Sequence, residues 1–372
     1  MPTECIAGRI ALTGRADARG EVDLNTGQPA WPSEGLERVA SCPVCGFSGR
    51  SSVHTNLTDR VFFCAPGSWE MYRCERCASC YLDPRPTPET IHLAYAQYFT
   101  HDEASNNSSG EPRFGLKKLR RSCANGYRNW RYGTQDRPAT ALGVVVAFLF
   151  PRLRHIADVG MRFVPRASTG RRLLDVGAGN GAFLLQARSA GWDVLGVEPD
   201  SAAVEAARRA GLDVRQGGIQ CLENERESID FITMNHVIEH VHDPRAVLSE
   251  AFKLLRSGGL LYLDTPNINS YGHARFGPNW HDLDPPRHLV LFNWKSLERL
   301  LEGVGFGGIK RLPRPGVYPT ISAKSRAIER GGDPRSIDKS PPVLGLVDAL
   351  RGMRTNLNYQ GSEYITLLAV KP

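Results

Sequence analysis

The chain has 372 residues, of which 41% are apolar and 23% charged, the composition of a soluble globular protein with a sizeable core. Its longest apolar run, residues 139–150, is too short to span a bilayer, and the polar first residues lack the apolar stretch of a secretory signal. The net charge of +7 is uneven, because residues 116–172 hold thirteen Lys/Arg and two Asp and the remainder nets about −4.

Paired cysteines dominate the N-terminal part of the chain. The two Cys-x-x-Cys pairs, separated by 28 residues, are Cys42/Cys45 and Cys74/Cys77. Two such knuckles are typical of a zinc ribbon, in which four thiolates hold one tetrahedral ion. We predict a closed, structural zinc site, and hence a reducing compartment, the cytoplasm. Cys80 is the weaker alternative ligand.

Flanking segments extend this predicted ribbon to a module of residues 39–99. Residues 61–63 and 69–73 have the composition of strands, and residues 88–99 that of a helix. The run from Cys-Pro-x-Cys-Gly through Tyr-Leu-Asp-Pro-Arg-Pro to this helix resembles the N-terminal zinc-binding module of some bacterial methyltransferases, including ones encoded with cell-surface saccharide and natural-product pathways. Residues 1–38 are expected to be a poorly ordered arm, in which only residues 6–12 have strand character.

A linker of residues 100–166 follows. Residues 100–115 are rich in Ser, Asn and Gly and indicate a loop, whereas residues 116–166 are basic and helical in pattern. If residues 140–150 form a helix, nearly every face of it is apolar, which favours a helix buried against the next domain. The alternative is a lid or interfacial element near an amphiphilic or phosphorylated ligand, whose phosphates the arginines would match.

The most informative stretch is residues 171–198. A short apolar run containing Asp175 leads into a turn with three glycines and then a helix, and a second strand ends at Glu198. Glycines let backbone N–H groups approach a ligand, and Glu198 is placed to accept hydrogen bonds from ribose hydroxyls. The glycine spacing also fits a dinucleotide fold, but Asp175 would lie unfavourably close to a pyrophosphate. The Asp175 carboxylate instead suits a cationic ligand that carries an amino acid.

Leu-Leu-Asp-Val-Gly-Ala-Gly-Asn-Gly and Val-Glu-Pro-Asp resemble the first two motifs of class I S-adenosylmethionine-dependent methyltransferases. The resemblance covers about residues 171–310. It implies a doubly wound α/β, Rossmann-like sheet of seven strands, the last antiparallel, over residues 167–372 with an insertion at 313–360. It implies S-adenosylmethionine as cofactor, held by Asp175, Gly177, Ala178, Gly179, Gly181, Glu198, Pro199, Gly218, Ile219, Asn235, His236 and His240. The family's acid after strand three is absent, so Gly218 and Ile219 offer only backbone and apolar contacts.

Apolar runs predict the remaining elements of this sheet. Strands are expected at residues 213–216, 229–234, 260–265, 306–312 and 363–370, and helices at 201–210 and 243–255. The insertion at 313–360 is expected to hold loops and two helices. Because ligands bind at the carboxyl ends of parallel strands, the loops after strands four and five should form the site.

The loop after strand four contains His236-x-x-Glu239-His240 within a Val-Ile-Glu-His-Val run. The same spacing occurs in inverted zincin proteases, but its place at a strand end disfavours proteolysis. The run resembles a signature of quinone-pathway O-methyltransferases, some of which hold a divalent ion here. Since His236 stands where a carboxylate is expected, we favour a supporting role in the cofactor pocket over a metal site.

The loop of residues 271–292, after strand five, concentrates histidines and aromatic residues. An oxygen or nitrogen acceptor must lose a proton during methyl transfer, and a histidine suits that role. His288 is the first candidate base and His281 the second. Arg287 could instead pair with an acid and brace the loop.

These features predict a methyltransferase that acts on a small-molecule or saccharide acceptor. Phosphorylated and lipid-linked acceptors are compatible with this prediction, and so is peripheral contact with a membrane. The main competing hypothesis is an RNA methyltransferase with a zinc-ribbon RNA-binding module. Few aromatics interleave with the basic residues and no Asn/Asp-Pro-Pro-Tyr motif follows strand four, so nucleic acid is disfavoured. Two weaker hypotheses are a non-catalytic cofactor- or partner-binding scaffold and a nicotinamide oxidoreductase. The sequence leaves the methylated atom and the oligomeric state open.

Overall fold

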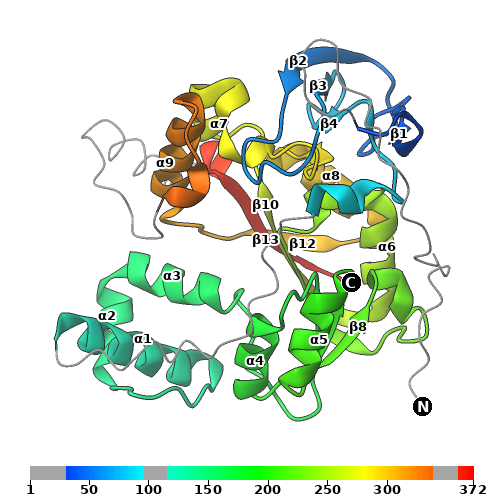
Figure 1. Cartoon of the computed structure of the whole chain (residues 1–372). Coiled ribbons are helices and arrows are strands. Elements are labelled where there is room, and N and C mark those ends of the chain that lie inside the picture. Colours follow the sequence, from blue (N-terminus) through cyan, green and yellow to red (C-terminus); the bar gives the residue numbers. More distant parts are fainter. Residues whose placement is uncertain (1–30, 96–114, 338–358) are drawn as a thin grey trace.

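The computed structural model describes residues 31–95, 115–337 and 359–372 (Figure 1). Its largest sheet has seven strands in the order β12-β13-β10-β9-β6-β7-β8. The strands are β6 Arg172–Val176, β7 Asp193–Glu198, β8 Asp213–Gln216, β9 Ile229–Asn235, β10 Leu255–Pro266, β12 Gly307–Arg311 and β13 Tyr364–Val370. β8, β7, β6, β9 and β10 are parallel neighbours, whereas β13 is antiparallel to β10 and β12. The predicted doubly wound sheet is confirmed.

Helices cover both faces of this sheet, because its strands carry apolar side chains on both sides. Leu173 packs with α4 and α5 on one face, and Leu174 packs with α6 and α8 on the other. These helices are α4 Ala182–Ser189, α5 Ser201–Arg209, α6 Pro244–Leu254 and α8 Trp294–Val304. Three of them start at side-chain caps, Asp200, Asp243 and Asn293, which accept hydrogen bonds from the first turn.

A second sheet belongs to the N-terminal module, residues 31–95. Its strands β2 Arg50–Leu57, β3 Trp69–Cys74 and β4 Cys80–Leu82 are antiparallel neighbours. The fourth strand is β11, Val290–Leu291, which comes from the loop beyond β10 and pairs with β4. Two short strands, β1 Leu36–Glu37 and β5 Arg85–Pro86, form a separate pair. The module therefore shares a sheet with the C-terminal part of the chain.

The N-terminal prediction needs three corrections. Residues 61–63 are not a strand, because the Asp59 carboxylate accepts hydrogen bonds from four backbone N–H groups, of residues 61, 62, 64 and 65, and curls this segment into a loop. The helix expected at residues 88–99 is a 3-10 helix, Ile91–Tyr95, as far as it is described. Residues 31–38 are not loose, since Trp31 is buried edge-on against Trp69.

The basic linker forms three helices, α1 Leu116–Tyr132, α2 Leu142–Leu149 and α3 Pro151–Gly160, which pack on one another, with α1 next to α4 (Figure 1). The expectation that residues 140–150 are buried is wrong. Only Gly143 and Ala147 of α2 are buried, and its large side chains face outward. No helix in the described ranges has the length and apolar character needed to cross a bilayer.

The insertion at 313–360 contributes α9, Val317–Glu329, which contacts α7, Tyr271–Phe276. The second helix expected there falls largely on residues 338–358, which lie outside the described residues. The strand expected at 6–12 and most of the loop expected at 100–115 also lie outside them.

Candidate functional site

The glycine turn between β6 and α4 is fixed by packing on its inner side. A Cβ on Gly177 would lie 2.7 Å from Val237 Cγ2, and one on Gly181 would lie 2.3 Å from Leu212 Cδ1, so a side chain at either position would displace its neighbour. Both residues also have a positive φ, 71° and 82°, which favours glycine. Gly179 differs, because a Cβ there would meet nothing within 4 Å. The middle of the turn is therefore open, and its backbone is accessible to a ligand.

Glu198, at the end of β7, holds this turn in place. Its Oε2 accepts a hydrogen bond from Gly179 N–H at 2.8 Å, and its Oε1 accepts one from Asp200 N–H at 3.0 Å. Burial raises the pKa of Glu198 above its ordinary value, although these two hydrogen bonds oppose the shift. Each carboxylate oxygen keeps a second lone pair, so Glu198 can still accept hydrogen bonds from ligand hydroxyls.

Asp175 is fully buried at the carboxyl end of β6 and makes an ion pair with Arg162. Its Oδ1 also accepts a hydrogen bond from Thr233 Oγ1 at 2.6 Å, whereas its Oδ2 has no hydrogen-bond partner among the described residues. The guanidinium of Arg162 lies 3.8 Å from the ring centre of Phe183. A carboxylate oxygen that lacks a partner, next to an arginine, complements the ammonium and carboxylate of an amino acid.

The other predicted cofactor residues lie at neighbouring strand ends. Glu198 pairs with Gln216 in the β7–β8 register, and Gly218 and the buried Ile219 follow at the start of a 3-10 helix. Asn235 ends β9, and Pro199 is exposed directly after β7. The sheet thus brings together positions that the sequence separates by up to sixty residues.

His236 takes an uncommon backbone conformation for a non-glycine residue, with φ of 55°. Its Nδ1 lies 3.2 Å from Glu239 Oε1, and its ring centre lies 4.7 Å from that of Tyr364. Burial lowers the pKa of His236, but the hydrogen bond and charge of Glu239 outweigh it and raise the pKa above the ordinary value. His236 directly follows β9 and contacts Tyr364, the first residue of β13.

His240 and His288 lie together, with ring centres 4.7 Å apart. His240 Nδ1 lies 3.0 Å from the carbonyl oxygen of Arg287, and His288 Nδ1 lies 2.7 Å from that of Asp282. Since carbonyls only accept, these nitrogens carry protons, and the Nε2 atoms are free to accept. Burial, followed by the charge of His288, lowers the pKa of His240 to about 4. With Glu239 the two rings form a group whose ligand atoms lie within 4.8 Å of one another.

His281 has a different arrangement. Its Nδ1 lies 2.7 Å from Asp282 Oδ1, and 15% of its side chain is exposed. A carboxylate at Nδ1 holds the imidazole with its Nε2 free to accept a proton. Asp282 Oδ2 is buried without a hydrogen-bond partner in the described part of the chain. His281 and Asp282 thus have the geometry of a general base and the group that orients it.

Sequence reasoning missed Arg162, Arg314 and Glu363. Arg314 Nε lies 3.0 Å from Asp264 Oδ2 at the end of β10, and Glu363 is buried just before β13, where it accepts hydrogen bonds from Gly272 N–H and Trp280 Nε1. None of these three residues stands in a motif or at a spacing that would single it out. Only the fold brings them to the strand ends.

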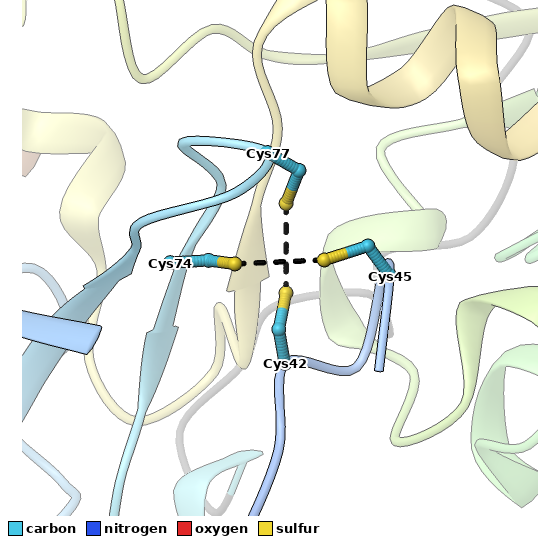
Figure 2. Close-up of side chains that lie close together, drawn as sticks. All are labelled: Cys42, Cys45, Cys74 and Cys77. Carbon is cyan, nitrogen blue, oxygen red and sulfur yellow. Dashed lines mark hydrogen bonds between the residues drawn. The ribbon is translucent and has the colours of Figure 1, made fainter. Parts of the chain in front are cut away.

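The four predicted zinc ligands converge in the N-terminal module, where their side chains point toward one centre (Figure 2). Cys42 Sγ lies 3.6 Å from Cys77 Sγ, and Cys45 Sγ lies 3.5 Å from Cys74 Sγ. Tetrahedral zinc with Zn–S bonds of about 2.3 Å separates its sulfurs by about 3.8 Å, so the cluster has the size of such a site. The hydrogen bond to Cys77 and burial raise the pKa of the Cys42 thiol, so a full set of thiolates needs a cation.

The methyltransferase-domain family model matches residues 148–310. A "probable S-adenosylmethionine-dependent methyltransferase" of Mycolicibacterium smegmatis is 32% identical over 139 residues, which make up 37% of this chain and 52% of that protein. A ubiquinone biosynthesis O-methyltransferase of Brucella anthropi is 30% identical over 181 residues, 45% of this chain and 72% of the relative.

Among solved structures, a Haemonchus contortus phosphoethanolamine N-methyltransferase 2 in complex with S-adenosyl-L-methionine superposes with a TM-score of 0.45 at 19% identity, covering 87% of this chain and 69% of that one. The chain spans about half the length of the M. smegmatis relative and nearly three quarters of the B. anthropi one.

Proposed function

Because the chain belongs to the S-adenosylmethionine-dependent methyltransferases, we propose that it transfers a methyl group from S-adenosylmethionine to a small-molecule or saccharide acceptor. The observation that carries the proposal is the Asp175–Arg162 pair beside the open glycine turn. It offers an acceptor for the ammonium and a cation for the carboxylate of the methionine part. A pyrophosphate would meet the buried Asp175 carboxylate instead, which disfavours a dinucleotide.

In this proposal the cofactor lies across the carboxyl ends of the parallel strands. Glu198 accepts hydrogen bonds from the ribose hydroxyls, and Gly218 and Ile219 border the adenine. The remaining contacts come from the turn and the loops after β7 and β9, at Gly177, Ala178, Gly179, Gly181, Pro199, Asn235, His236 and His240. S-adenosylmethionine supplies an electrophilic methyl group bound to a sulfonium.

We place the acceptor beyond the ends of β10 and β13, where polar groups surround Tyr364. Burial raises the pKa of Tyr364 well above its ordinary range, and the charges of Asp282 and Asp264 act in the same direction. His281 is our first candidate for the base that removes the acceptor proton, because it is partly exposed and Asp282 orients it. His288, which the sequence ranks first, is more buried and becomes the second candidate.

A zinc ion held by Cys42, Cys45, Cys74 and Cys77 would be structural, because four thiolates leave no open coordination position. The N-terminal module that they organise packs on the loop beyond β10 through β11. We therefore assign the metal to shaping the acceptor side of the site. The thiolate cluster requires a reducing compartment, for which the cytoplasm is the expected location.

Calorimetry with S-adenosylmethionine, S-adenosylhomocysteine and NADH tests the cofactor assignment. The first two should bind, and NADH should not. Glu198→Ala and Arg162→Gln should each weaken binding by about 1–3 kcal/mol, since each removes a charge-assisted hydrogen bond. Arg166→Gln is the matched control, because its exposed guanidinium donates to the Trp130 carbonyl oxygen. Tight binding of NADH without binding of S-adenosylmethionine would sink the proposal.

A methyl-transfer screen tests the acceptor class. Saccharide, quinone, lipid and RNA acceptors are compared with labelled S-adenosylmethionine, with mass spectrometry to locate the methyl group. Turnover on a saccharide or another small molecule supports the proposal. Turnover on RNA alone replaces it with the RNA methyltransferase. Cofactor binding with no turnover on any class favours a non-catalytic scaffold.

A further inference from the structure

Nearly all of the large apolar side chains that are exposed in the described residues lie in the segment of the three linker helices. Of the ten large apolar side chains that are exposed among the described residues, nine lie between residues 119 and 156. The six most exposed of these nine, which we call the apolar face, are Leu119, Leu142, Val145, Phe148, Leu149 and Phe150, with 54–69% of each residue accessible. An isolated exposed leucine is ordinary, but a cluster of this kind marks an interaction surface.

This exposure follows from how α2 packs on α1. A Cβ on Gly143 would lie 1.9 Å from the Cys123 carbonyl oxygen, and one on Gly126 would lie 1.9 Å from that of Thr140. The two backbones therefore meet through glycines, and Ala147 is the other buried residue of α2. Because the small residues face inward, the large ones must face outward. The apolar face is a consequence of tight helix packing and does not indicate a loose helix.

The exposed charged side chains described in the segment of these three helices have one sign. Lys118, Arg120, Arg121, Arg131, Arg137 and Arg152 are all exposed. Of the two acids of residues 116–160, one is paired with an arginine and the other is buried. Asp136 pairs with Arg128 at 2.9 Å, and Asp158 is buried, where its Oδ1 accepts hydrogen bonds from two tyrosine hydroxyls. Exposed apolar side chains among exposed cations complement a surface that is apolar inside and anionic outside.

We propose that α1–α3 dock on an anionic membrane surface, with the apolar face entering the lipid and the cations contacting lipid phosphates. Bilayers combine these two chemistries at one boundary, and peripheral amphipathic helices use both. Docking needs no membrane-spanning helix and does not depend on the proposed methyl transfer.

The docked helices lead directly to the candidate cofactor site. α3 ends at Gly160, and Arg162, two residues further on, makes the ion pair with Asp175. The short segment that follows α3 thus joins the docking helices to the ion pair beside the glycine turn. If the methyltransferase proposal holds, this arrangement specifies an amphiphilic acceptor that is drawn from the lipid surface.

Vesicle flotation of the full chain tests the docking. Vesicles of phosphatidylcholine alone are compared with vesicles that contain phosphatidylglycerol, at low and high salt. The wild-type chain should float with the anionic vesicles and lose most of that binding in phosphatidylcholine or at high salt, because screening weakens the cationic contacts. Phe148→Ser with Leu149→Ser should reduce binding at least about ten-fold, because each serine removes an apolar side chain that would enter the lipid. Arg120→Gln with Arg121→Gln should reduce the preference for anionic lipid.

Phe63→Ser is the matched control, because Phe63 is the exposed large hydrophobic outside this segment, and its change should leave flotation unaltered. Circular dichroism and calorimetry with S-adenosylmethionine separate docking from folding and from cofactor binding. Equal flotation of wild type and Phe148→Ser/Leu149→Ser overturns the proposal. So does light scattering that shows a wild-type dimer which this double variant splits, with no vesicle binding by either, because a second copy then covers the face.

Discussion

The guanidinium of Arg287 donates two hydrogen bonds to the carboxylate of Asp59, a residue 228 positions earlier in the chain, at 2.5 and 3.1 Å. Both side chains are buried, and Arg287 also bonds Asp284 at 2.6 Å and the Ala94 carbonyl oxygen at 2.8 Å. Burial alone would raise the pKa of Asp59, but Arg287 holds it below its usual range. One arginine therefore fastens the N-terminal module to the loop of the candidate bases.

Replacing this arginine should destabilise the protein strongly. Arg287→Met leaves two buried carboxylates without their cation, so we expect the free energy of unfolding to fall by about 3–5 kcal/mol. Arg335→Met is the control, because the Arg335–Asp333 pair is exposed and should contribute at most about 1 kcal/mol. Chemical denaturation of both variants measures the difference, and equal losses would contradict a special role for Arg287.

Zinc content and stability should change together. Purified protein should carry about one zinc per chain, and Cys74→Ser should lower that content, whereas Cys123→Ser, which alters a thiol outside the cluster, should not. Removing zinc with a chelator should lower the melting temperature, because four clustered thiols lose the ion that joins them. Elemental analysis and thermal melts check both. A metal-free native protein of unchanged stability would refute the ligand assignment.

Replacing the candidate bases should lower turnover and leave cofactor affinity nearly unchanged. At saturating acceptor, His281→Ala should reduce kcat by about 10²–10⁴-fold if a hydroxyl is methylated, and His288→Ala should do so if it is the base instead. His92→Ala is the control, since this histidine is exposed on the 3-10 helix of the N-terminal module. Full turnover by both variants would exclude both residues and direct the search to His236 and His240.

Glu363 should make stability depend on pH. Burial, followed by the charge of Asp282, raises its pKa from 4.5 to about 8. Its stabilising contribution is therefore fully present below about pH 4.5 and is lost as the pH rises through about 8. Glu363→Gln mimics the neutral carboxyl, so its free energy of unfolding should fall less than that of wild type between pH 5 and pH 9.

Urea denaturation across this pH range checks the effect, with Glu329→Gln as control because Glu329 forms an exposed pair with Arg275. If the wild-type and Glu363→Gln curves run parallel, Glu363 does not titrate in this range.

Local patterns allowed the core sheet and the cysteine cluster to be predicted. The stretch from Asp175 to Glu198 encodes the end of a strand, a glycine turn, a helix and a second strand within 24 residues, and the zinc ligands occur in two short pairs. Arg162 and Arg314 could not be found this way, because their carboxylate partners belong to other elements. Burial of residues 140–150 was predicted from composition alone. The contact of Gly143 with α1, which turns the large side chains outward, has no signature in that composition.

The pairing of β11 with β4 also has a consequence for how the protein is made. Residues 80–82 are synthesised roughly 200 residues before Val290 and Leu291, so this edge of β4 stays unpaired by β11 while much of the chain is still being translated. An open edge is a template for pairing with other chains. The N-terminal module, although first in the sequence, can therefore reach its final form only after the catalytic sheet has been largely synthesised.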